Sequence, residues 1–110
     1  MAGDRSEIIA KIETVAEKID AAGYRLVKVY LYGSYAKGAV HEYSDIDTAF
    51  VSPDFHQESM EEWSALLRIC NEVDLRIEPV FYRPEDFVDE EPLAWNIKTS
   101  GIEVPLRKAA

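Results

Sequence analysis

The stretch from Gly33 to Asp47 constrains this chain most, because it combines a glycine turn with two acids at a short, fixed distance. A mostly apolar run at 26–32 precedes the turn and predicts a central strand buried on both faces. A Gly-Ser turn (Gly33, Ser34) that opens a helix presents backbone N–H groups and a hydroxyl, and such groups bind anions. The sequence therefore predicts a phosphate-binding turn at the end of this strand, followed by a short helix at 34–37.

Two acids, Asp45 and Asp47, are separated by one residue at the start of a predicted strand at 45–51. Side chains two positions apart share a face of a strand, with Cα atoms roughly 6.5–7 Å apart, so both acids can reach one cation. Carboxylate oxygens beside a triphosphate suit Mg²⁺, which binds through one or two carboxylates and phosphate oxygens. A third carboxylate would allow two ions about 3.5–4 Å apart to be held.

The segment 73–80 offers two candidates for that third acid, Asp74 and Glu78. Their alternation with apolar residues predicts a strand that has one polar face along a cleft and one apolar face in the core. The polar set is Asp74, Arg76 and Glu78, and the apolar set is Val73, Leu75 and Ile77. Both acids then point to the same face, so the register alone does not choose between them.

The segment from Gly33 to Asp47 resembles the signature of the minimal nucleotidyltransferases of the DNA polymerase beta superfamily. That signature is a Gly-Ser turn, a basic residue and a glycine shortly after it, and then Ser-Asp-hydrophobic-Asp; Lys37 stands where many relatives carry arginine. The resemblance covers most of the 110 residues. It implies one domain, 1–110, of class α/β (α+β), with a polymerase-beta-like nucleotidyltransferase fold in which a small mixed sheet carries helices mainly on one face.

The resemblance also implies roles for individual residues. Asp45 and Asp47 would be catalytic and would bind the metal, two Mg²⁺ ions, with Mn²⁺ as an alternative. The nucleotide would be bound by Gly33, Ser34 and Lys37.

In relatives, the third carboxylate is often followed by a short apolar stretch and then by a Pro-Glu-Asp-Phe-like segment. Here Glu78 precedes such a segment, 84–87, at a fitting distance. We therefore expect Glu78 to be the third catalytic and metal-binding acid, with Asp74 in reserve. Glu78 is one methylene longer than the usual aspartate.

By resemblance, the activity is transfer of an NMP group, AMP from ATP in the first instance, to an acceptor hydroxyl. Small enzymes of this kind resemble the antitoxin halves of toxin–antitoxin modules, which adenylylate a tyrosine of a helical HEPN-type toxin; others act with a helical substrate-binding subunit. We expect ATP or another NTP and a helical protein as partners. The acidic and aromatic segment 81–90 is either a contact surface or a solvated loop. The alternatives are a non-catalytic nucleotide- or partner-binding module with a degenerate site, and a hydrolase.

Composition narrows the partners and the compartment. The formal charge is −9, with 21 acidic and 12 basic residues and no basic cluster, so binding to long nucleic acid is not expected. The one cysteine, Cys70, is expected in the core of a chain from a reducing compartment. The sequence has no apolar run of about 18 residues and no signal-peptide pattern, which predicts a cytoplasmic protein without a membrane span.

The helices are predicted from apolar periodicity and capping residues. A first helix, opened by Asp4 and closed near Gly23, should cover the sheet. Another helix begins after Ser59 and ends near Asn71. Its expected inner face is Met60, Trp63, Leu66, Leu67 and Cys70.

Proline and glycine positions predict the rest of the order. Pro79 cannot donate to a strand ladder, which predicts that the third strand is an edge there or that its pairing ends just beyond Glu78. Pro92 and Gly101 bound a last helix that precedes a strand at 102–104. The full predicted order is α-β-α-β-α-β-α-β.

Overall fold

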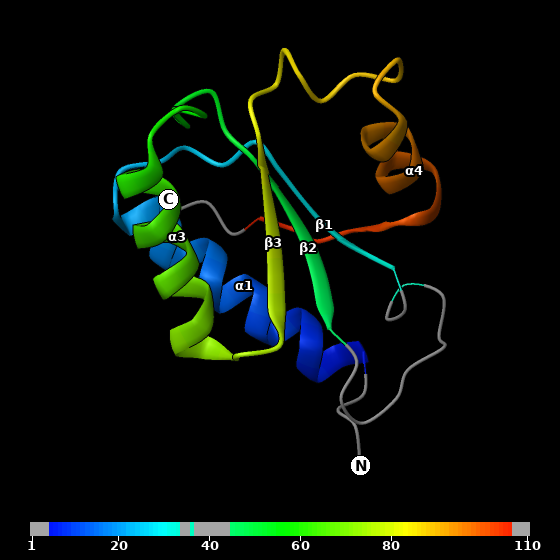
Figure 1. Cartoon of the computed structure of the whole chain (residues 1–110). Helices are drawn as coiled ribbons and strands as arrows, with labels where there is room; N and C mark the ends of the chain where they lie inside the picture. The colour runs from blue at the N-terminus through cyan, green and yellow to red at the C-terminus, as the bar shows by residue number, and fades with distance from the viewer. Residues whose placement is uncertain (1–4, 34–35, 37–44, 107–110) are drawn as a thin grey trace.

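The computed structural model describes residues 5–33, 36 and 45–106, and it contains a four-stranded sheet flanked by helices (Figure 1). The elements in order are α1 (Arg5–Ala21), β1 (Lys28–Tyr32), β2 (Ile46–Val51), α3 (Met60–Val73), β3 (Ile77–Tyr82), α4 (Pro92–Ser100) and β4 (Ile102–Glu103). Asp4 and, except for Ala36, the predicted helix at 34–37 lie outside the described residues. Elsewhere the predicted order of elements is confirmed.

The sheet is mixed, with the strand order β3-β2-β1-β4. β1 pairs antiparallel with both β2 and β4, whereas β2 pairs parallel with β3. Pro79 therefore lies on an edge strand, as its missing N–H predicted, and β1 and β2 are neighbours as expected. The end of β1 at Tyr32 and the beginning of β2 are side by side, so both motif halves meet at one end of the sheet.

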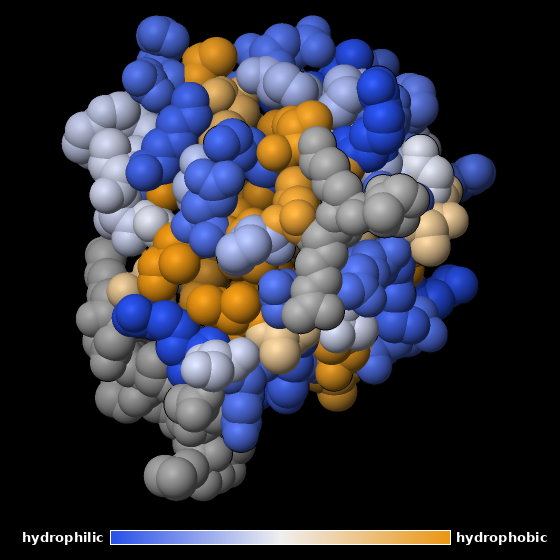
Figure 2. Space-filling view, turned by 180° about the vertical axis from the view of Figure 1, so that it is seen from behind, coloured by the Kyte–Doolittle hydropathy of each residue, from blue (hydrophilic) through white to orange (hydrophobic). Residues whose placement is uncertain are grey.

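Alternate residues of each strand pack into two hydrophobic clusters on opposite faces of the sheet. On one face, α1 and α3 cover Val29, Leu31, Ile46, Phe50 and Ile77. On the other face, α4 and the segment before it cover Ala49 and Val51, with Phe87, Ala94 and Ile97. Figure 2, from behind, shows hydrophobic residues in the middle of the molecule with hydrophilic residues around them. Two of the three described helices share a face, which agrees with the predicted architecture.

Helix boundaries follow the capping residues. The backbone N–H of Ala22 donates to the carbonyl of Lys18 at 3.1 Å, and Gly23 follows at φ +104°, which ends α1 as predicted. At α3, the Ser59 hydroxyl accepts from the backbone N–H of Glu62 at 3.1 Å. The carboxylate of Glu62 bonds to His56 rather than to Ser59, so only half of a capping box forms.

The structure corrects three expectations about packing. Met60 and Trp63, predicted on the inner face of α3, are 72% and 46% exposed, and only Leu66 and Cys70 of that set are buried. The first strand begins at Lys28 rather than at residue 26. It is not buried on both faces, because its buried residues alternate with exposed or half-buried ones. Segment 81–90 is not a purely solvated loop, because β3 extends to Tyr82 and Phe87 is buried; its role as a contact surface stays a prediction.

No described helix has both the length and the apolar composition needed to cross a membrane. Cys70 is fully buried, as expected, and burial raises the pKa of its thiol to about 12.

Phe87→Ala should destabilise the protein strongly, because the ring packs against Tyr30 and Tyr82 with centroids 5.6 and 5.1 Å away. Removing a buried phenylalanine side chain costs about 3–5 kcal/mol. Urea unfolding measures the loss. Trp95→Ala on α4 is the control, because Trp95 is 54% exposed. Equal losses for the two variants would contradict the packing described.

Candidate active site

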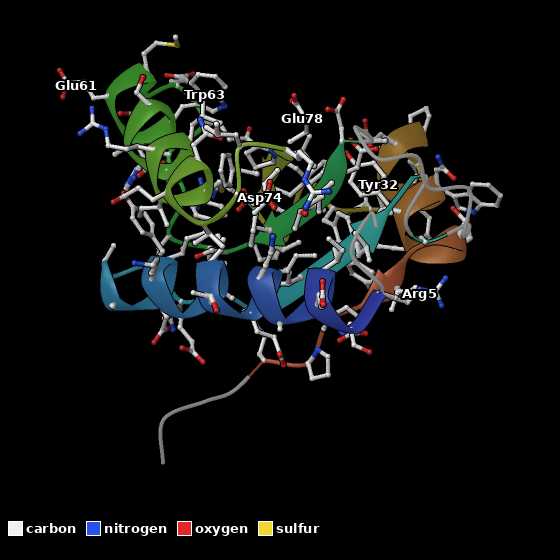
Figure 3. All side chains as sticks on the ribbon, turned by 90° about the horizontal axis from the view of Figure 1, so that it is seen from below. Arg5, Tyr32, Glu61, Trp63, Asp74 and Glu78 are labelled. Atoms are coloured by element: carbon white, nitrogen blue, oxygen red, sulfur yellow. The ribbon has the colours of Figure 1, made fainter. Side chains whose placement is uncertain are left out.

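Three side chains form a row across the sheet at the end where β1 stops and β2 begins. Tyr32 of β1 pairs with Asp47 of β2, and Asp47 pairs with Glu78 of β3. Because paired residues of neighbouring strands point to the same face, all three side chains lie on one face. It is the face opposite α1, and Figure 3 shows Glu78 and Tyr32 on that side.

Of the two predicted motif acids, Asp47 belongs to this row and Asp45 lies two residues before it. Asp45 is exposed and precedes β2 by one residue, and Asp47 is half-buried inside the strand. Burial raises the pKa of the Asp47 carboxyl, and the charges of Asp45 and Glu78 raise it further. The carboxylate of Asp47 therefore lies close enough to those of Asp45 and Glu78 to be repelled by both.

Gly33 makes room for the Asp47 carboxylate. Its φ is +72°, a left-handed conformation that glycine adopts without steric cost. A Cβ on this residue would overlap Oδ2 of Asp47. The glycine of the predicted phosphate turn thus has a second role, because it shapes the space in which a motif acid lies.

Tyr32 is a site residue that the sequence reasoning missed. It is half-buried, and burial raises its pKa to about 12, with further contributions from the charges of Asp47 and Glu78. Its hydroxyl is protonated at neutral pH, as that of an ordinary tyrosine is, and can donate a hydrogen bond. The only sequence signal was its position, one residue before the glycine of the turn.

Arg5 is a second residue that the sequence reasoning passed over. Its Nη2 donates to the carbonyl of Ala36 at 3.1 Å, so the start of α1 contacts the chain just after the turn. Ser34 and Lys37, the other two predicted nucleotide-binding residues, lie outside the described residues.

The reserve acid, Asp74, does not share a strand face with Glu78, so that expectation was wrong. Asp74 is the C-cap of α3, and β3 begins only at Ile77. Leu75, expected in the core, is 81% exposed in the turn between them. The carboxylate of Asp74 bonds to Arg76 and Lys11, and these bonds, those of Arg76 first, hold its pKa well below the ordinary value.

The three neighbouring carboxylates have the chemistry of a Mg²⁺ site, since they are hard oxygen donors whose mutual repulsion a cation would relieve. Among residues 5–33, 36 and 45–106, no three acidic, histidine or cysteine side chains are already gathered closely enough to hold an ion. Asp45 and Glu78 are exposed, so their side chains can turn towards a cation without repacking the core. The donor set fits a divalent metal on these grounds.

A family model described as "Nucleotidyltransferase domain" matches residues 7–104 of the sequence. The chain belongs to this family. The resemblance to the minimal nucleotidyltransferases of the polymerase beta superfamily is thereby confirmed. A search of curated proteins found no match.

Solved structures of nucleotidyltransferases and toxin–antitoxin proteins share the fold. A presumed nucleotidyltransferase from Sulfolobus solfataricus aligns with a TM-score of 0.61 at 15% identity, over 94% of this chain and 84% of the other. A toxin–antitoxin structure with AMP-PNP aligns with a TM-score of 0.64 at 22% identity, over 91% and 74% of the two chains. A mutant of the toxin–antitoxin MntA-HpeT, with two aspartates replaced by glutamate, aligns with a TM-score of 0.58 at 20% identity, over 96% and 76%.

Gly33→Ala should remove most activity, because the new Cβ displaces the Asp47 carboxylate. A displacement of about 1 Å in a catalytic group can lower the rate about 100-fold. Gly23→Ala is the matched control: it places alanine at φ +104°, where no atom lies within 4 Å of the new Cβ. Both substitutions place alanine at a positive φ and should lower stability, but only Gly33→Ala should lose nucleotidyl transfer. Equal transfer rates for the two would contradict the role given to Gly33.

Asp47→Asn should raise the melting temperature in EDTA at pH 7. The folded-state pKa of Asp47 lies above its ordinary value of 3.8, so the ionised carboxylate destabilises the folded protein. This cost is full above the folded pKa, declines as the pH falls through it, and is absent below the unfolded value. Melting curves of both proteins from pH 7 to pH 3.5 should converge at the acid end. A variant less stable than the parent at pH 7 would contradict the repulsion.

Proposed function

We propose that this protein is a metal-dependent nucleotidyltransferase that moves AMP from ATP to a hydroxyl on a partner protein. The observation that carries the proposal is the pairing of Asp47 with Glu78, beside Asp45 and against the glycine turn at Gly33. Family membership supports nucleotidyl transfer in general. We propose the donor nucleotide, the metals and the acceptor in addition to this general activity.

Asp45, Asp47 and Glu78 would hold two Mg²⁺ ions, with Mn²⁺ as an alternative, and Asp74 would not take part because Arg76 and Lys11 engage its carboxylate. When bound, the ions would supply charge neutralisation for the triphosphate and would make the acceptor hydroxyl more acidic. Glu78 is the most exposed acid of the cross-strand row and lies on the edge strand, so it can turn towards an incoming acceptor.

The reaction joins the acceptor oxygen to the α-phosphorus of ATP and breaks the bond to the β-phosphate, which releases pyrophosphate. Glu78 would accept the proton of the acceptor hydroxyl. Gly33 directly follows β1 at the end of the sheet where the acids lie, and it would bind the phosphates of the nucleotide together with Ser34 and Lys37, which come after it in the sequence. Tyr32, which stays protonated, would donate a hydrogen bond on the same face.

The structural neighbours support a nucleotide and a protein partner. One neighbour is a toxin–antitoxin structure with AMP-PNP, an ATP analogue. In the MntA-HpeT mutant, the two replaced aspartates are separated by one residue, which is the spacing of Asp45 and Asp47 here. A tyrosine on a helical, HEPN-type partner is accordingly the acceptor that we propose, and the chain would act as the antitoxin.

The second candidate function is a non-catalytic binding module. Two observations favour it: the third acid is a glutamate, and the described acids are not gathered into a ready ligand set. Such a module would bind its partner through the same surface without transferring a nucleotide. The two functions therefore differ in what Asp47→Asn does.

Incubation with α-labelled ATP, Mg²⁺ and cell extract should label a protein, and mass spectrometry should find AMP on a hydroxyl. Asp47→Asn should abolish the label and leave partner capture intact, because it removes a metal ligand and keeps the shape of the side chain. Millimolar Mg²⁺ with ATP should raise the melting temperature of the parent, since ligands that bind only the folded state stabilise it.

Three outcomes separate the candidates. Partner capture without labelling by any of the four NTPs would favour the binding module. Release of free phosphate without labelled protein would indicate a hydrolase. A melting temperature that does not respond to Mg²⁺ and ATP would contradict the proposed site.

A further inference from the structure

Asp74 lies at the centre of a network of side chains that joins α1, the end of α3 and the start of β3. We propose that Asp74 is a positioning residue, which fixes the register of β3 against β2 and so holds Glu78 opposite Asp47. This inference rests on the proposed function for its catalytic consequence. Its structural half, that Asp74 fixes the register of β3, can be tested without measuring any activity.

The Asp74 carboxylate is held on both oxygens. Oδ1 accepts from the backbone N–H of Arg76 at 2.8 Å and from Nε of Arg76 at 3.1 Å. Oδ2 accepts from Nη2 of Arg76 at 2.8 Å and from Nζ of Lys11 at 2.7 Å. The side chain of Asp74 is only 9% exposed. Four charge-assisted or backbone hydrogen bonds leave this carboxylate one orientation.

The backbone of the same turn continues the network into the sheet. The N–H of Asp74 donates to the carbonyl of Cys70 at 3.1 Å, which ends α3, and the N–H of Ile77 donates to the carbonyl of Asp74 at 3.2 Å. The carbonyl of Arg76 then accepts from the N–H of Ile46 at 2.8 Å. Ile46 directly precedes Asp47, and Arg76 lies two residues before Glu78. The hydrogen bond between Arg76 and Ile46 therefore joins the turn to the sheet, next to the pair Asp47–Glu78.

The register of β3 needs such an anchor. Among the strands that the structure describes, β3 is at the edge and pairs with β2 alone, so a single ladder holds it. A slip of one residue would turn every side chain of a strand to the opposite face. Glu78 would then leave the face of Asp47, and an apolar neighbour would replace it. Fixing the first ladder bond at Arg76 prevents this slip.

Lys11 ties the turn to α1, which is packed against the sheet through its buried apolar side chains. In Figure 3, Asp74 lies between α1 and the sheet, whereas Glu78 lies on the far side. The position of Glu78 is thus fixed relative to α1 as well as to β2. The Asp74 carboxylate thus contacts both Lys11 of α1 and Arg76, the residue directly before β3.

Amide hydrogen exchange measured by NMR tests the structural half at two ends of the same strand pair. The N–H of Ile46 reports the end near Asp74, and the N–H of Ser52, which donates to the carbonyl of Tyr82 at 2.9 Å, reports the far end. Asp74→Ala should speed exchange at Ile46 by about tenfold or more beyond any change at Ser52, because an unanchored strand end opens locally.

Asp54→Ala is the matched control. Oδ2 of Asp54 accepts from the backbone N–H of Arg25 at 2.9 Å and from its Nε at 3.3 Å, so a similar aspartate anchors the opposite end of the sheet. This control should leave Ile46 protected and transfer unchanged. Asp74→Asn keeps an acceptor for the N–H of Arg76 and should restore part of the protection, and Lys11→Met tests the link to α1 alone in a protein with its turn intact.

Kinetics test the catalytic half. Asp74→Ala should lower kcat about 10- to 100-fold, the usual cost of losing a partner that orients a metal-binding residue, with KM for ATP changed less than about twofold. Mn²⁺ affinity, measured by calorimetry, should fall with kcat, and Asp74→Asn should recover part of both. A fall in melting temperature with Mn²⁺ affinity and kcat unchanged would overturn the proposal.

The two failures can be told apart. Unchanged exchange at Ile46 in Asp74→Ala would overturn the positioning role whatever the activity of the protein. Faster exchange at Ile46 together with weaker Mn²⁺ binding, in a protein whose parent transfers no nucleotide, would support the positioning role and overturn the proposed function instead.

Discussion

The pairing of Asp47 with Glu78 across two parallel strands is the constraint on which the candidate site depends. It brings acids from distant parts of the sequence onto one face, where their charges and partial burial raise the pKa of Asp47. Such an arrangement opposes folding unless it is held from outside. Gly33 makes room for one carboxylate, and the turn at Asp74 anchors the strand that carries the other. The surrounding structure thus keeps the carboxylates close together despite their mutual repulsion.

Local patterns in the sequence predicted most of the fold. Ser59, Pro79, Pro92 and Gly101 act through their own backbone or through a hydrogen bond to a near neighbour, so their effects can be read without knowing the tertiary structure. The spacing of Asp45 and Asp47 is local in the same sense. Apolar periodicity predicted burial wrongly at positions where tertiary packing decides which side chains are covered. Met60 and Trp63 continue the apolar stripe of α3 in the sequence, yet both are exposed.

The site was predictable only in part, because its geometry depends on pairing between strands. Alternation suggested that Asp74 and Glu78 were equivalent, yet the strand begins after Asp74, whose carboxylate forms an Asx-type turn with Arg76. A pattern of alternating residues cannot show where a turn ends. Tyr32 was missed for a related reason. It becomes a neighbour of both acids through the register of β1 against β2, which no short motif encodes.

We propose, above all, that divalent ions bind between Asp45, Asp47 and Glu78 when a nucleotide is present. A crystal structure with Mn²⁺ and a non-hydrolysable ATP analogue tests it, because anomalous scattering locates the metal directly. We predict one or two anomalous peaks within about 2.0–2.4 Å of oxygens from these carboxylates and of the phosphates. Peaks on Asp74, or a bound nucleotide with no metal near Asp47, would contradict the account.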